Sequence, residues 1–133
     1  TQVAGRRQRQ MCIRDSHYAA ADLLVCRAGA TTVAEITAFG KAALFIPFPF
    51  AADNHQQFNA QALVTAGAAD MILERDLTGA LLARKLQFYR SHRDCLAALA
   101  VRARELGRAD AAQAIVADCC HLIGAHTVPH SKG

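Results

Sequence analysis

Tryptophan is absent from the 133-residue sequence, and aromatic residues make up only 6% of it. A face that binds nucleic acid is typically built from clustered Lys and Arg with aromatic side chains among them. Here the basic residues are scattered, and four of the fifteen lie with a single acid in residues 1–16, so that segment carries most of the formal charge of +4. We therefore expect no nucleic-acid partner.

The cysteine pattern excludes a second class of protein. Five is an odd number, no CxxC pair occurs, and Cys26 falls inside an apolar run, as a small buried side chain would. The sequence therefore predicts a reducing, cytoplasmic setting rather than a disulfide-stabilised secreted protein.

Long apolar runs are missing as well. Gly, Pro or a charged residue interrupts each run well short of the about 20 residues that span a bilayer. Residues 1–16 also lack the apolar stretch of a signal peptide. We expect a soluble piece, which does not exclude a peripheral association with a membrane.

The composition that remains, 53% hydrophobic and 20% charged, is that of one globular domain. Short apolar runs alternate with helical patterns. Strands separated by helices imply parallel βαβ units, so the fold class is α/β. The strands are expected at 23–26, 42–46 and 69–73, and the helices at about 32–39 and from a cap at Asp53 or Asn54 to Ala66. Gly40 and Gly67 are placed to end these two helices.

After Asp76 the pattern changes to helices only, which we interpret as a three-helix carboxyl-terminal part. Its apolar side chains recur at helical spacing and are expected to pack in the core. They are Leu81, Leu82, Leu86 and Tyr89, then Leu96, Leu99, Ala103 and Leu106, then Ile115, Cys119, Leu122 and Ile123.

The most informative segment is DLLVCRAGATTVAE, in which an apolar strand breaks at Gly29 and restarts as a helix. Small residues at 28–30 let a phosphate approach the backbone N–H groups at the helix start, and the hydroxyls of Thr31 and Thr32 can add donors. The alternative is that the glycine serves turn geometry only. The spacing matches neither GxGxxG nor a Walker loop. Glu35 also has two interpretations, a capping box with Thr32 or a carboxylate that binds a ribose diol, and spacing alone favours the box.

A second segment, PFPFAADNHQQFNA, follows the next strand and opens a helix with polar amides. Amide side chains offer both a donor and an acceptor to sugar hydroxyls. Gln56 and Asn59 are therefore candidate sugar ligands, although the residues alone favour the simpler interpretation, an exposed polar helix start. Because both segments follow parallel strands, we expect them to meet at the carboxyl edge of the sheet, where α/β folds bind ligands.

These two segments, CRAGATTVAEI and ALFIPFPFAADNHQQFNAQALVTAGAA, closely resemble the carboxyl-terminal domain of the MurG family of glycosyltransferases. The resemblance covers about residues 18–123. It implies one Rossmann-like half of a GT-B enzyme with two domains, the half that holds the UDP-N-acetylglucosamine donor. The resemblance implies that the acceptor is a lipid-linked muramoyl-pentapeptide. It also implies that the full enzyme attaches peripherally to the cytoplasmic face of the bacterial inner membrane.

The resemblance also assigns residues. It implies that Ala30, Thr31 and Thr32, with Val33 and Ala34 in the same segment, meet the donor sugar and diphosphate, and that Glu35 binds the ribose hydroxyls. This reverses the preference for a capping box. It further implies that Gln56 holds the N-acetylglucosamine hydroxyls with Gln57 or Asn59 in support, and that neither a metal nor another cofactor is needed. An Asp-x-Asp pair is indeed absent from the sequence.

Several departures from the family define the expected domains. We interpret residues 1–16 as a non-native tail, because MCIRDS resembles translated sequencing adapter and does not match the family segment ahead of Tyr18. Residues 17–123 are then a donor domain truncated at its start, and residues 124–133 a flexible tail. The acceptor domain and the histidine expected as general base have no counterpart in the sequence, so a fragment inactive on its own is expected.

Three other functions remain open. A related UDP-sugar transferase with a different acceptor would share this half, and a non-catalytic nucleotide-sugar-binding module is an alternative of another class. A metal site from Cys119, Cys120, His121 and His126 is the weakest, because adjacent residues on a helix point about 100° apart.

Overall fold

The computed structural model describes residues 16–122, without the side chains of Asp53 and residues 109–122. Its sheet has three parallel strands in the order β1-β2-β3, comprising β1 (Leu23–Cys26), β2 (Ala42–Phe45) and β3 (Asp70–Met71). Leu23 pairs with Ala42, and Leu44 pairs with Asp70. The predicted α/β class and the first strand are confirmed, whereas the second and third strands are shorter than expected.

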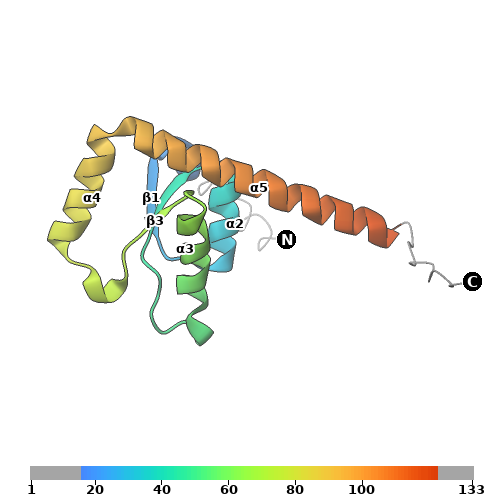
Figure 1. The fold of residues 1–133 in the computed structure, drawn as a ribbon, viewed down its shortest axis with the longest axis horizontal. Coiled ribbons are helices and arrows are strands. Elements are labelled where there is room, and N and C mark those ends of the chain that lie inside the picture. The colour runs from blue at the N-terminus through green and yellow to red at the C-terminus, as the bar shows by residue number, and fades with distance from the viewer. Residues whose placement is uncertain (1–15, 123–133) are drawn as a thin grey trace, which may run out of the picture.

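Helix α2 (Ala30–Phe39) connects β1 to β2, and α3 (His55–Thr65) connects β2 to β3 (Figure 1). Gly40 ends α2 with φ 61° and ψ 53°, the left-handed conformation that glycine adopts without steric cost. The predicted end of this helix is therefore confirmed. In Figure 1 the carboxyl ends of the strands point to the bottom, where α2 and α3 begin.

One predicted helix start is wrong, and the other is right in position but lacks the side-chain cap. Helix α2 begins at Ala30 with Gly29 as its N-cap, so Thr32 lies inside the first turn and no capping box with Glu35 forms. A 3-10 turn (Ala52–Asn54) precedes α3, and Asn54 adopts φ 55° with no hydrogen bond from its side chain to the helix. The backbone at Asn54 is left-handed, whereas a residue that caps with its side chain is usually extended.

The core lies between the sheet and three helices. Phe45, Ile36 and Leu44 are its largest fully buried side chains, and Ala103 of the long helix α5 (Arg93–Leu122) is also fully buried. Cys26 packs against this cluster, and burial raises the pKa of its thiol to about 11. The thiol is therefore protonated at neutral pH, as expected of a packing residue.

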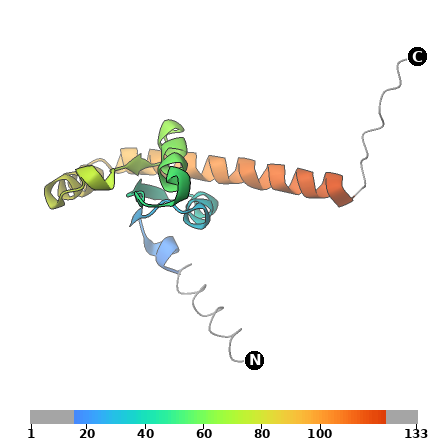
Figure 2. The same cartoon turned by 90° about the horizontal axis from the view of Figure 1, so that it is seen from below.

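As far as residue 122, where the described part ends, the carboxyl-terminal part consists of two helices, α4 (Gly79–Ser91) and α5, rather than the three expected. Helix α5 runs unbroken past Gly107 and extends beyond the sheet (Figures 1 and 2). Tyr89, Leu96 and Ala103 are buried as predicted, and Leu99 and Leu106 pack against the core.

One predicted core residue of α4 is wrong. The side chain of Leu86 is 40% exposed, because α4 turns the face with Lys85 and Tyr89 toward Asp70 of β3. The predictions for residues 1–15 and 123–133, including both tails, and for the side chains of Ile115, Cys119 and Leu122, fall outside the described residues. Within residues 16–122, no helix combines the length and apolar character that crossing a membrane requires.

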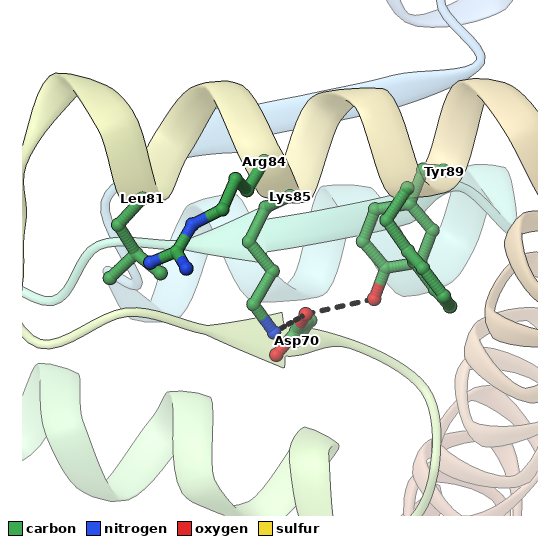
Figure 3. Close-up of a pocket in the computed structure, with 6 residues that line it drawn as sticks. Asp70, Leu81, Arg84, Lys85 and Tyr89 are labelled. Carbon is green, nitrogen blue, oxygen red and sulfur yellow. Dashed lines mark hydrogen bonds and ion pairs between the residues drawn. The ribbon is translucent and has the colours of Figure 1, made fainter.

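A polar cluster fastens α4 to the edge strand β3 (Figure 3). One carboxylate oxygen of Asp70, Oδ2, accepts hydrogen bonds from Lys85 Nζ at 2.6 Å and from Tyr89 Oη at 2.8 Å. The other accepts from Met71 N at 2.8 Å. Burial alone would raise the pKa of Asp70, but these hydrogen bonds and the Lys85 charge outweigh burial and hold the pKa below its usual value.

This cluster predicts a pH dependence of stability. Since the pKa of Asp70 is lower in the folded chain than in the unfolded chain, its contribution is complete above the unfolded value of 3.8 and is lost as the pH falls through the lower folded value. We expect the free energy of unfolding to fall as the pH is lowered from 5 to 2, and to fall less steeply in Asp70→Asn than in the wild type. Urea denaturation over this range of about three pH units measures both slopes. Asp22→Asn, which removes an exposed carboxylate, is the control. Equal slopes in the wild type and Asp70→Asn would contradict the arrangement.

Candidate functional site

The turn between β1 and α2 leaves the start of a helix open. Its N-cap is Gly29, with φ −64° and ψ 151°. Glycine has no side chain with which to cap the helix. The first bond of the helix runs from Val33 N to Gly29 O at 3.0 Å, so the N–H groups of residues 30–32 point out of the helix end. The first turn holds no acidic side chain. These N–H groups and the positive end of the helix dipole can therefore meet an anion.

Two amide side chains of α3 hold this turn in place. The Gln56 Oε1 atom accepts hydrogen bonds from Ala28 N at 3.3 Å and from Phe48 N at 2.9 Å. Asn59 Nδ2 donates to Ala28 O at 3.1 Å. Both polar groups of the Ala28 backbone are thus bound by α3, and the predicted meeting of the two segments at the carboxyl edge of the sheet is confirmed.

The same contacts bear on the ligand role expected of Gln56. Its oxygen already accepts two backbone N–H groups, which leaves Nε2 as the atom that can donate to a sugar hydroxyl. This nitrogen lies next to the turn, 4.0 Å from the position that a Cβ on Gly29 would occupy. Gln56 can therefore join the two segments and still present a donor beside the helix end.

Arg27 contributes a support that the sequence reasoning missed. Its Nη1 donates to Ile46 O at 3.2 Å and Pro47 O at 3.4 Å and pairs with the carboxylate of Glu74. Its guanidinium lies 5.5 Å from the centre of the Phe48 ring. Arg27 thereby ties the segments that follow all three strands. Its place between a strand and a glycine turn was the available signal.

The remaining predicted residues divide into exposed and supporting positions. Thr31 and Ala34 are exposed, Thr32 is half-buried, and Val33 packs against the core. Glu35 is half-buried, and its Oε2 accepts a hydrogen bond from Tyr18 Oη at 2.9 Å.

Gln57 faces a different hollow. Its side chain is exposed and lines a pocket of about 140 Å³ beside the loop that follows β2, bounded also by Pro47, Phe48, Asn54 and Glu74. Among the described residues no group of three potential metal ligands occurs. The side chains of Cys119, Cys120 and His121, and the whole of His126, lie outside the described part.

Comparison with known proteins identifies the family. Residues 13–115 match the model of the glycosyltransferase family 28 C-terminal domain. The chain belongs to this family. The matched residues include β1, α2, β2 and α3, and so both segments that meet at the open helix end.

Relatives within family 28 include two curated proteins named UDP-N-acetylglucosamine–N-acetylmuramyl-(pentapeptide) pyrophosphoryl-undecaprenol N-acetylglucosamine transferase. The protein from Geobacter sp. (strain M21) is 59% identical over 100 residues, which cover 75% of this chain and 27% of the relative. The protein from Syntrophus aciditrophicus (strain SB) is 53% identical over 113 residues, which cover 84% of this chain and 31% of the relative. This chain thus spans between about a quarter and a third of their length.

A solved structure agrees with this assignment. The crystal structure of Acinetobacter baumannii MurG matches with a TM-score of 0.60 and 42% sequence identity, over 66% of this chain and 25% of that one. The three-stranded parallel sheet with its helices therefore corresponds to part of a family 28 enzyme, as the resemblance implied.

Proposed function

We propose that this chain binds UDP-N-acetylglucosamine and serves as the donor-binding half of a transferase that moves N-acetylglucosamine to a lipid-linked muramoyl-pentapeptide. The observation that carries the proposal is the open start of α2, bracketed by Gln56 and Asn59. It occurs in a chain 59% identical to a relative named for this donor and this acceptor.

In this proposal each group of the donor has a partner. The diphosphate meets the N–H groups of residues 30–32 and the hydroxyls of Thr31 and Thr32, while Val33 and Ala34 continue the helix behind them. Glu35 accepts from the ribose hydroxyls and Gln56 Nε2 donates to the sugar. Of the two candidates for support, Gln57 and Asn59, the structure favours Asn59, which holds Ala28 O in the turn. The helix dipole and backbone amides offset the charge that develops on the leaving UDP, a role that a cation plays in other transferases.

Transfer itself needs more than these residues. A general base and an acceptor groove are expected in the part of the relatives' length that this chain does not span. We therefore expect the isolated chain to bind donor without transferring sugar. In a protein of the relatives' length we expect the reaction at the cytoplasmic face of the bacterial inner membrane, with peripheral attachment, since the acceptor is a lipid.

Isothermal titration calorimetry of the chain with UDP-N-acetylglucosamine, UDP and UDP-glucose tests the proposal. We expect saturable binding of the first two and weaker binding of UDP-glucose, which lacks the acetamido group. No heat with any of them at millimolar concentration would contradict donor binding. Equal affinity for both UDP-sugars would contradict recognition of the acetamido group and favour the alternative, a related UDP-sugar transferase with a different acceptor.

Gln56→Glu separates two roles of Gln56, which are to hold the turn through Oε1 and to donate a hydrogen bond to the sugar through Nε2. Glutamate keeps an oxygen for Ala28 N and Phe48 N but loses the donating nitrogen and adds negative charge beside the diphosphate. We expect a free energy of unfolding within about 0.5 kcal/mol of the wild type and at least about tenfold weaker binding of UDP-N-acetylglucosamine.

Gln61→Glu is the matched control, because it adds the same charge to an exposed position on the same helix. It should leave the affinity near that of the wild type. Wild-type affinity in Gln56→Glu would show that Nε2 does not contact the ligand.

A further inference from the structure

Glu35 is held by a residue from a distant part of the chain. Its Oε2 accepts the hydroxyl proton of Tyr18 at 2.9 Å, across 17 positions in sequence. Tyr18 belongs to a helical segment at residues 16–20 that precedes β1, whereas Glu35 lies in the second turn of α2. The contact therefore crosses between two separate elements.

Tyr18 reaches Glu35 from a supported position. Its ring stacks on Phe39 with centroids 5.5 Å apart and planes inclined by 20°, and it packs against the main core cluster. The segment that carries Tyr18 is fastened in turn by Lys41, whose Nζ donates to Ala19 O at 3.0 Å and to Ala21 O at 3.1 Å. The hydroxyl is thus presented from a packed ring rather than from a loose side chain.

We propose that Tyr18 is a positioning residue that sets the orientation of the Glu35 carboxylate for the ribose diol. This inference rests on the proposed function. A vicinal diol donates to a carboxylate best when both oxygens face it, and a Glu side chain in solvent samples many rotamers. A hydrogen bond to Oε2 restricts these rotamers before the ligand arrives, and a carboxylate oxygen can accept a second bond.

The effect should be confined to ligands with a ribose diol. In Tyr18→Phe the ring and its stacking remain and only the hydroxyl is lost. We expect the dissociation constant for UDP to rise by about three- to tenfold, the range for one lost orienting hydrogen bond. Binding of 2′,3′-dideoxyuridine diphosphate, which has no diol, should not change. If Tyr18 had only a structural role, Tyr18→Phe would lower the affinity for both ligands equally.

Two further variants complete the experiment. Tyr89→Phe removes the only other tyrosine hydroxyl, which binds Asp70, and should leave UDP affinity unchanged. In a Glu35→Ala background, Tyr18→Phe should have no further effect on UDP affinity, because the carboxylate that it orients is gone.

Calorimetry on these variants separates the possible failures. If Tyr18→Phe binds UDP as tightly as the wild type does, or loses affinity equally for UDP and its dideoxy analogue, the positioning role is wrong while donor binding stands. If the wild type binds neither nucleotide, donor binding fails, and the positioning role fails with it.

Discussion

Replacing Gly29 with serine is expected to stabilise the fold and at the same time to weaken donor binding by at least about tenfold. Gly29 has φ −64° and ψ 151°, which any residue adopts, and a Cβ there would meet only Gln56 Nε2 at 4.0 Å, an ordinary contact. The fold therefore does not require glycine at this N-cap. The missing side chain leaves the N–H groups of α2 accessible to the proposed diphosphate.

Serine would close this helix end in two ways. Its hydroxyl would accept from the N–H groups of the first turn, which are the groups proposed to bind phosphate. Because serine is the better cap and restricts the unfolded chain more than glycine does, the free energy of unfolding should rise by about 0.5 to 1 kcal/mol. Urea denaturation and calorimetry with UDP-N-acetylglucosamine measure the two effects.

The existing cap of α4 supplies the control. Thr78 Oγ1 accepts from Leu81 N at 3.1 Å, so Thr78→Ala should lower stability by about 1 kcal/mol and leave donor affinity unchanged. Full donor affinity in Gly29→Ser would contradict a binding site at the start of α2.

The second large effect concerns the packing of α5 on α2. A Cβ on Gly107 would lie 2.4 Å from Thr37 O and 3.1 Å from Ala38 N, which are backbone atoms. These atoms cannot move aside by a change of rotamer, so Gly107→Ala must separate the two helices. We expect a loss of about 3 kcal/mol in the free energy of unfolding, measured by urea denaturation.

The sign of this effect is informative, because intrinsic helix propensity alone favours alanine over glycine by about 1 kcal/mol. Gly79→Ala, at the start of α4 with nothing within 4 Å of its Cβ position, is the matched control and should be neutral or stabilising. A Gly107→Ala variant as stable as the wild type would show that α5 does not pack this closely on α2.

Local signals in the sequence predicted the local features of the fold. The apolar run at Leu23–Cys26 formed the expected strand, and Gly40 ended α2 as expected. The predicted start of α2 is wrong because both glycine and threonine are common at the N-cap. The sequence alone therefore does not distinguish Gly29 from Thr32 as the capping residue. The predicted burial of Leu86 is wrong because helical spacing does not show which part of an apolar stripe faces the sheet.

The site was predictable at the level of topology. Parallel strands bring the segments after β1 and β2 to one edge, and they meet there through Gln56 and Asn59. The contacts of Arg27 with Ile46, Pro47 and Glu74 span 19 to 47 positions in sequence. Such long-range contacts leave no periodic pattern, so the sequence alone predicts neither the contacts of Arg27 nor the bond between Tyr18 and Glu35.

Backbone and side-chain amide NMR during a titration with UDP-N-acetylglucosamine tests the central claim most directly. We predict that the largest shifts occur at the N–H groups of residues 30–32 and at the side-chain amide of Gln56, and that they saturate. Asp70 and Lys85 also line a pocket on the far side of β3, beside α4 (Figure 3). Shifts confined to this pocket, or no shifts at millimolar ligand, would contradict a donor site at the start of α2.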